Sequence, residues 1–206
     1  MENIVIGIVL RKRKIDKKEY RVVEENNFRY LEGKCNYRGI IGDIDNLEKE
    51  LELCDGIIIP GGTEIEDYHF RIVDYCKRKN IPVLGICMGC QILGLSSFKG
   101  RDQDLVLVDN HNDSNHEIIV KEDSVLRKIL GKKIMVNSRH NYVLPKEKVK
   151  MKIGSLSKEG YIESVEDINK DYFLLGLEWH PEDMDNMDNL YNYYLKEVLT
   201  RKIHKN

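Results

Sequence analysis

Cys87 stands between two glycines at the end of an apolar run, and this setting suits a nucleophile. The run 83–86 has the composition of a buried strand, and Gly85 and Gly89 bracket the cysteine. Small neighbours are needed where a strand turns sharply into a helix and holds a nucleophile in a strained backbone conformation. The sequence therefore predicts a nucleophile elbow, with Cys87 at the start of a helix that runs to about Ser96.

A base and a carboxylate that orients it follow far downstream. His180 and Glu182 are two residues apart, and Pro181 between them fixes φ and favours the bend that brings their side chains together. A cysteine nucleophile needs such a base and such an orienting group. We therefore predict a hydrolytic triad of Cys87, His180 and Glu182. The alternative for Glu182 is that it only begins the acidic loop 182–188.

Two features of the predicted elbow lower the expected pKa of the Cys87 thiol. A helix N-terminus and an adjacent imidazolium both stabilise a thiolate.

The segment Pro60-Gly61-Gly62 ends another apolar run, and a glycine turn presents backbone N–H groups to a developing oxyanion. We assign one oxyanion donor to Gly62, assisted by Gly61, and the other to the N–H of Met88. Taken alone, the glycine pair also fits a plain turn.

Residues 87–90 also form a Cys-x-x-Cys pattern, which raises the possibility of a redox or metal site. A zinc site needs further ligands at matching spacing, and the sequence has no second cysteine pair. His111, His116 and His140 lie too far apart in sequence to indicate one. We expect Cys90, one helical turn after Cys87, to pack in the core as a small hydrophobic residue. No metal and no cofactor are expected.

The elements that must position these residues alternate in type along the first half of the chain. Apolar segments without polar alternation, typical of strands covered on both faces, are followed by charged segments of helical period. This order predicts a doubly wound parallel sheet. The expected strands are 4–9, 56–59 and 83–86, and the expected helices lie around 47–54, 72–80 and 88–96.

The second half of the sequence is richer in strands and predicts a mixed or antiparallel extension of the sheet. A last segment with apolar residues three and four apart, 190–199, predicts a docked C-terminal helix. We read the lysine-rich segment 11–18 as a solvated loop, which can also border the active site. The strands expected in this half are 105–108, 117–121, 133–136, 151–155, 161–165 and 172–177.

Composition limits the classes of function. The chain has 206 residues and a formal net charge of −2, which fits one α/β domain and argues against a nucleic-acid surface or a polybasic membrane anchor. No apolar run approaches the roughly 20 residues that span a bilayer. The five cysteines are odd in number and scattered, which favours reduced thiols and a cytoplasmic protein.

Three motifs together resemble the class I glutamine amidotransferase superfamily: the Pro-Gly-Gly turn, the Gly-Ile-Cys-Met-Gly-Cys-Gln elbow and the Trp-His-Pro-Glu segment. The segments 100–105, 116–120 and 136–140 are closer to its γ-glutamyl hydrolase (peptidase C26) branch, which includes γ-glutamyl-γ-aminobutyrate hydrolase. The resemblance covers about residues 55–182. It implies a flavodoxin-like, doubly wound fold and a single domain of this type over residues 1–206.

The resemblance also implies a substrate. The carbonyl of a small γ-glutamyl amide would be attacked by Cys87 to give a γ-glutamyl thioester, which water hydrolyses. Gln91, Ser138 and His140 would line the glutamyl pocket. Gln91 could instead bridge backbone groups within its helix, and His140 could be a surface loop histidine. Asn141-Tyr142 departs from the branch, which often has a second polar pair including glutamine there, so the acceptor side of the pocket is expected to differ.

Two enzyme functions and one non-catalytic function fit these motifs. The first is a stand-alone hydrolase of a γ-glutamyl amine, because we find no synthetase domain in the sequence. The second is a glutaminase subunit that supplies ammonia to a separate synthetase. A non-catalytic binding or stress protein would not need the complete set of Cys87, His180 and Glu182. The expected partners are a small substrate and either a second copy of the chain or a synthetase, with no nucleic acid or membrane.

Overall fold

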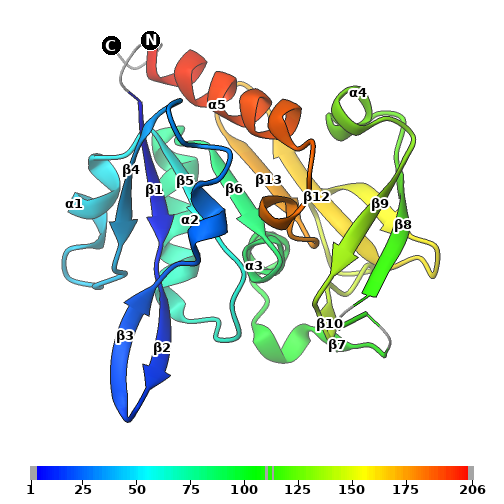
Figure 1. Cartoon of the computed structure of the whole chain (residues 1–206), viewed down its shortest axis with the longest axis horizontal. Coiled ribbons are helices and arrows are strands. Elements are labelled where there is room, and N and C mark those ends of the chain that lie inside the picture. The colour runs from blue at the N-terminus through cyan, green and yellow to red at the C-terminus, as the bar shows by residue number, and fades with distance from the viewer. Residues whose placement is uncertain (1–3, 110, 113, 204–206) are drawn as a thin grey trace.

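Strands from both halves of the chain join in one main sheet, which has nine strands within the residues that the computed structural model describes (4–109, 111–112 and 114–203). Five parallel strands form one side of this sheet and four antiparallel strands form the other (Figure 1). In spatial order they are β4 (Asn36–Ile40), β1 (Val5–Val9), β5 (Gly56–Ile59), β6 (Val83–Ile86), β13 (Phe173–Leu177), β12 (Ile162–Ile168), β11 (Lys152–Ser157), β8 (Ser114–Val120) and β9 (Lys133–Ser138).

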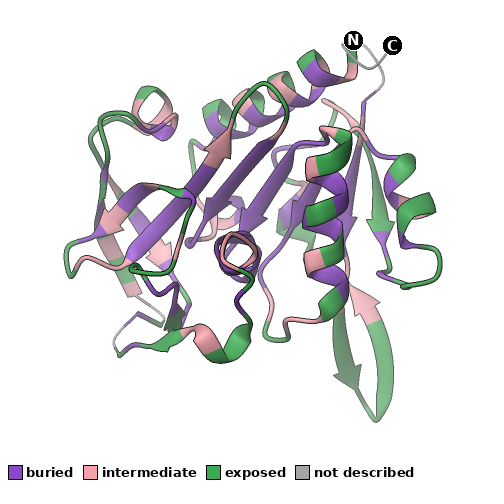
Figure 2. Ribbon diagram, turned by 180° about the vertical axis from the view of Figure 1, so that it is seen from behind, coloured by how far each residue is buried: buried purple, intermediate pink, exposed green. Residues whose placement is uncertain are grey.

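Helices cover both faces of the parallel strands. Successive residues of each strand point to opposite sides, so each strand contributes to two hydrophobic cores. Ile57 packs in the hydrophobic core that contains Ile72 of α2 (Asp67–Lys79). Its neighbour Ile58 packs in a second core on the other face, with Val198 of α5 (Asp188–Ile203). Helices α1 (Leu47–Glu52) and α3 (Met88–Ser96) contribute to the first core. Figure 2 shows the central strands buried along their whole length, as expected for a sheet covered on both faces.

This architecture confirms the predicted doubly wound sheet with its antiparallel extension. The three buried strands predicted in the first half are β1, β5 and β6, and the predicted C-terminal helix is α5. The six strands predicted in the second half are β7 (Val106–Leu107), β8, β9, β11, β12 and β13. Of these, β13 is the exception to the antiparallel pattern, since it lies parallel to β6 in the middle of the sheet.

The interpretation of residues 11–18 as a loop was wrong. Residues 11–22 form a β-hairpin of β2 (Arg11–Ile15) and β3 (Lys18–Val22), which projects from the sheet (Figure 1). The hairpin residues are mostly exposed. The segment is therefore in contact with solvent as predicted, although its backbone forms strands and not a loop. Asp16 and Lys17 form the turn, and both have positive φ.

Several short elements were not predicted. The edge strand β4 lies in the segment 26–42, for which no element was predicted. The others are β10 (Tyr142–Val143), α4 (Leu126–Leu130) and the 3₁₀ turns η1 (Glu25–Phe28), η2 (Asp102–Asp104) and η3 (Pro181–Asp183). Among the described residues, no helix is both long enough and apolar enough to cross a membrane.

Candidate active site

Cys87 lies between β6 and α3 in a strained backbone conformation. Its φ is 50° and its ψ is −108°, a combination that a residue with a side chain rarely adopts unless the surrounding structure holds it there. The strand and the helix on either side are both buried. The strained turn therefore exists as the sequence predicted, and it fixes where the thiol points.

The two glycines around Cys87 are required by close backbone packing. A Cβ atom on Gly89 would lie 2.1 Å from the carbonyl oxygen of Ile59, and one on Gly85 would lie 2.5 Å from the carbonyl oxygen of Gly89. Both contacts are with backbone atoms, which cannot move aside as a flexible side chain can. The elbow can therefore form only if both positions lack a side chain.

His180 and Glu182 meet at the bend that Pro181 begins. The 3₁₀ turn η3 brings Nδ1 of His180 to 2.7 Å from Oε1 of Glu182, and the glutamate is almost fully buried. Asn137, at the end of β9, binds both the backbone N–H and the backbone carbonyl of His180. Its Oδ1 accepts from the N–H of His180 at 2.8 Å, and its Nδ2 donates to the carbonyl of His180 at 2.9 Å. Asn137 is thus a positioning residue for this histidine.

The role of Asn137 was missed at the level of sequence, although the residue belongs to one of the quoted motifs. The available signal was a polar residue near the end of an expected strand. That signal does not reveal which segment the amide will contact.

Gly61 lies close to the side chains of both Cys87 and His180. A Cβ atom on Gly61 would lie 2.7 Å from Cε1 of His180 and 3.5 Å from Cβ of Cys87, so the two side chains flank this glycine. Among the described residues, Cys87 Sγ makes no hydrogen bond with the His180 ring. Hydrogen bonds between catalytic groups are often long in the absence of substrate and tighten when it binds.

The pKa of Cys87 is raised, which contradicts the expected lowering. Burial of the sulfur is the main cause, and the nearby carboxylates of Glu178 and Glu182 act in the same direction. The backbone N–H of Met88 at the start of α3 lowers the pKa, but this effect is smaller. The helix N-terminus therefore acts as predicted, and desolvation outweighs it.

Backbone donors are present where the oxyanion hole was predicted. Within the part of the chain that the structure describes, the N–H groups of Gly61 and Gly62 have no acceptor, and the carbonyl of Gly61 accepts from Arg11 at 3.4 Å. Gly62 and Met88 both line the cavity that contains Cys87. A Cβ atom on Gly62 would lie 2.9 Å from the end of the Met88 side chain, so these two residues are neighbours at the cavity.

This cavity is large enough for a small amino-acid derivative. Its volume is about 780 Å³, within the usual range of ligand pockets. Charged groups of both signs surround the thiol, including Glu64, Asp102 and Arg139. The Arg139 guanidinium is held by Asp183 at 2.5 Å.

The residues predicted to bind the glutamyl group have different positions. Gln91 lines the cavity, and its amide donates to Oε1 of Glu178 at 2.5 Å and to the carbonyl of Tyr142 at 3.1 Å. It therefore bridges to other segments and not to backbone groups of its own helix. His140 also lines the cavity and is buried, so the alternative of a surface loop histidine was wrong. Ser138 donates to the carbonyl of His111 and is absent from the described cavity lining.

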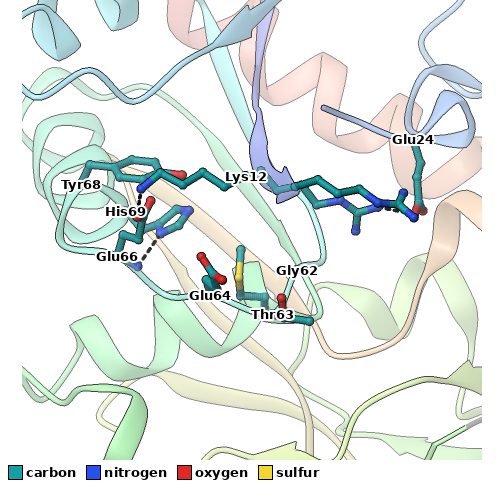
Figure 3. Close-up of a pocket in the computed structure, with 11 residues that line it drawn as sticks. Lys12, Glu24, Gly62, Thr63, Glu64, Glu66, Tyr68 and His69 are labelled. Atoms are coloured by element: carbon teal, nitrogen blue, oxygen red, sulfur yellow. Dashed lines mark hydrogen bonds and ion pairs between the residues drawn. The ribbon is translucent and has the colours of Figure 1, made fainter. Parts of the chain in front are cut away.

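A second cavity of about 260 Å³ adjoins the first at Gly62 and Met88. Figure 3 shows its wall, where Lys12 from the projecting hairpin pairs with Glu66 and the Glu66 N–H donates to Nδ1 of His69 at 3.0 Å. The hairpin therefore borders the active site, which is the position that the sequence allowed for segment 11–18.

The three histidines that were judged too dispersed for a constellation lie together. The ring centroids of His111 and His116 are 4.9 Å apart, and those of His111 and His140 are 5.2 Å apart. Distance in sequence was misleading, because β8 and β9 pair antiparallel and bring the segments at their ends together.

Known proteins share this fold. The glutaminase domain of Trypanosoma brucei CTPS, solved with bound acivicin, is similar with a TM-score of 0.77 and 17% identity, over 96% of this chain and 94% of that one. A glutamine amidotransferase from Thermotoga maritima has a TM-score of 0.63 and 16% identity, over 98% of this chain and 87% of that one. The fold of this chain is therefore that of glutamine amidotransferase domains.

The chain belongs to the peptidase C26 family, whose model matches residues 66–182. Protein NtpR of Enterococcus hirae is 27% identical over 56% of this chain, and CTP synthase of Saccharolobus solfataricus is 28% identical over 68% of it. The matches span only 53% of NtpR and 32% of that CTP synthase.

Proposed function

We propose that this chain is a cysteine-dependent hydrolase that cleaves the γ-glutamyl amide bond of a small γ-glutamyl amine. The observation that carries the proposal is the arrangement around Gly61. A strained elbow thiol and a carboxylate-oriented imidazole flank this glycine, beside N–H groups that have no acceptor in the described chain. Membership of the peptidase C26 family supports hydrolysis of an amide.

In the proposed reaction, the substrate carbonyl lies against the N–H groups of Gly62 and Met88. His180 takes the proton from the Cys87 thiol as the sulfur attacks the carbonyl carbon, and the negative charge develops on the carbonyl oxygen. His180 then gives that proton to the leaving amine, and the C–N bond breaks to leave a γ-glutamyl thioester. Water, deprotonated by His180, hydrolyses the thioester, and glutamate and the free thiol are released.

Because burial keeps the resting thiol protonated, proton transfer to His180 has to accompany substrate binding. Glu182 then stabilises the imidazolium that forms. The cavity supports recognition of the amino-acid end of the substrate, since Glu64 and Asp102 offer carboxylates for an ammonium group and Arg139 offers a guanidinium for a carboxylate. Gln91 and His140, which line the cavity, remain predicted contributors to this pocket, whereas Ser138 is not among its lining residues.

A second candidate function is that of a glutaminase subunit that supplies ammonia to a synthetase. It is favoured by the fold similarity to a glutaminase domain and by the match to about a third of a CTP synthase. Free glutamine would then be the substrate, and the partner would be a separate synthetase. The chemistry at Cys87 is the same in both cases, so the leaving group and the partner distinguish them.

The test is glutamate release by the purified chain from glutamine and from a panel of γ-glutamyl amines. We expect turnover of one γ-glutamyl amine well above that of glutamine, and none in Cys87→Ala. Weak turnover confined to glutamine, and increased by a synthetase, would support the glutaminase subunit. Near-normal turnover by a folded Cys87→Ala variant would refute both functions.

Variants of the other two residues test the proposed roles. Cys87→Ser and His180→Ala are expected to lower kcat by about 10³-fold or more, because each removes a group that takes part in bond or proton transfer. Glu182→Gln is expected to cost less, about 10- to 100-fold, since an amide can still orient the ring. Circular dichroism checks that all three variants are folded, and equal losses in all three would contradict the supporting role of Glu182.

A further inference from the structure

Four ionisable side chains gather within the antiparallel half of the sheet, behind the wall of the active-site cavity. His116 lies on β8 and Glu163 on β12, while His111 and His140 lie in the loops that precede β8 and follow β9. Nε2 of His116 lies 3.0 Å from Oε1 of Glu163, and Nε2 of His140 lies 3.9 Å from the same oxygen. We call these four residues the histidine cluster.

The histidine cluster has more buried polar atoms than its own members can satisfy. Nδ1 of His111, Nδ1 of His116, Nε2 of His140 and Oε2 of Glu163 are all buried without a hydrogen-bond partner. Buried polar atoms are nearly always paired in proteins, so one orphaned atom on each of four adjacent side chains calls for an explanation. A ligand that accepts several donor atoms at once would satisfy them together.

The charges in the histidine cluster also favour a cation. Glu163 is fully buried, and no lysine or arginine pairs with it among the described residues. Neutral imidazoles and a carboxylate are the forms that bind a metal ion, and a divalent cation would compensate the buried carboxylate.

The arrangement of ligand atoms fits a small metal site. One donor atom each from His111, His140 and Glu163 lie within 4.8 Å of one another. Tetrahedral zinc holds its ligands at about 2.0–2.2 Å, so modest side-chain movements would close the site. His140 already has the outer contact typical of a metal ligand, because its Nδ1 lies 3.1 Å from the carbonyl of Tyr142 and leaves Nε2 free.

We propose that His111, His140 and Glu163 bind a divalent transition metal, and that zinc is the ion that fits best. Two histidines and one carboxylate are borderline and hard donors, which zinc accepts in tetrahedral geometry with a fourth position open to water. His116 holds the carboxylate of Glu163, with its Nε2 at 3.0 Å from Oε1. The ion joins β12 to the loops of His111 and His140. It therefore stabilises the cavity wall without contact with the reacting atoms. The site goes beyond the proposed hydrolysis, and it adjoins the substrate pocket through His140, which also lines the active-site cavity.

A second group of potential ligands has to be separated from it. His180, Glu182 and Asp183 also lie close enough together to hold an ion, and the Cys87 thiol is nearby. Zinc added to the protein can therefore bind at the active site. A Cys87→Ala/His180→Ala double variant removes this competing site and leaves the histidine cluster unchanged.

The experiment is titration of the chelator-treated, purified chain with Zn²⁺ alone, followed by calorimetry. We expect one Zn²⁺ per chain in the Cys87→Ala/His180→Ala variant, in which the competing site is removed. His111→Gln and Glu163→Gln, made in that double-variant background, should each weaken binding at least about tenfold. His69→Gln is the matched control, because this buried histidine lies outside the histidine cluster, and it should leave Zn²⁺ affinity unchanged.

Loss of stoichiometric binding in the Cys87→Ala/His180→Ala variant would overturn the proposal, and so would unchanged affinity in Glu163→Gln.

A second measurement, with cobalt, tests the proposal even if a variant of the histidine cluster fails to fold. The wild-type chain with one Co²⁺ should show the absorption of nitrogen and oxygen ligation. A thiolate-to-cobalt charge-transfer band at one equivalent would overturn the proposal, because the histidine cluster contains no cysteine.

Discussion

Cys87 has two properties with opposite effects on its reactivity. Its strained backbone and the Met88 N–H position the sulfur for attack, whereas its burial and the neighbouring carboxylates disfavour the thiolate. The second effect dominates the resting protein. The thiol is therefore protonated at neutral pH, and in the proposed reaction its activation depends on His180.

A direct consequence is the pH dependence of alkylation at Cys87. Because its pKa lies above the ordinary value of 9.0, the thiolate fraction should still be rising at pH 9. We expect the rate of iodoacetamide modification of Cys87 to keep increasing with pH above this value, as measured by mass spectrometry of the Cys87 peptide. A rate that levels off below pH 7 would show a preformed thiolate and contradict this account.

At the residue scale, the sequence allowed prediction of much of the candidate site. Cys87, Gly61, His180 and Glu182 were recognisable because glycine spacing and the His-Pro-Glu turn are local signals. The histidine cluster was not, because His116 reaches Glu163 only through the pairing of distant strands. Spacing along the chain carries no information on that pairing.

The elements that were predicted correctly are those whose burial is visible in their composition. The strands β1, β5 and β6 are uninterrupted apolar runs because helices cover both of their faces. Strand β4 was missed because it is an edge strand with four of its five residues exposed. The hairpin β2–β3 is stabilised by its own backbone pairing and carries charged side chains, so no apolar pattern marks it.

The packing of α3 against β5 gives a test at this scale. The Cβ atom added in Gly89→Ala would lie 2.1 Å from the carbonyl oxygen of Ile59, which is backbone. We expect this variant to lower the free energy of unfolding by at least about 3 kcal/mol, as measured by urea denaturation.

Gly39→Ala is the matched control, since its new methyl group would meet only the side chain of Leu10, at 2.9 Å. A movable side chain can give way, so we expect a loss below about 1 kcal/mol. Equal losses in Gly89→Ala and Gly39→Ala would show that backbone contact at the elbow is not the limiting factor.

For the whole molecule, buried histidines make stability dependent on pH. Burial lowers the pKa of His69 from 6.5 to about 4 in the folded chain. Between these two values the unfolded chain binds more protons at this position, so stability falls as pH decreases from about 6.5 to 4. His140 acts in the same direction, whereas the raised pKa of His116 opposes it.

We therefore expect a shallower loss of stability with acidification in His69→Gln than in the wild type. The full effect of His69 is roughly 3 kcal/mol. Trp179 is the single tryptophan and is fully buried, so its fluorescence reports unfolding in urea at each pH. Parallel curves for the two proteins between pH 6.5 and 4 would exclude His69 as the source.

The position of β13 has a consequence for the order in which the protein can be built. This strand lies between β6 and β12 in the main sheet, although it is the last strand in the sequence. A chain that emerges from the ribosome completes the elbow around Cys87 long before it supplies residues 173–182. Until then, the edge of β6 is open to incorrect pairing with other chains. Insertion of β13 closes that edge and brings His180 beside the thiol, so completion of the sheet and assembly of the proposed catalytic residues are one event.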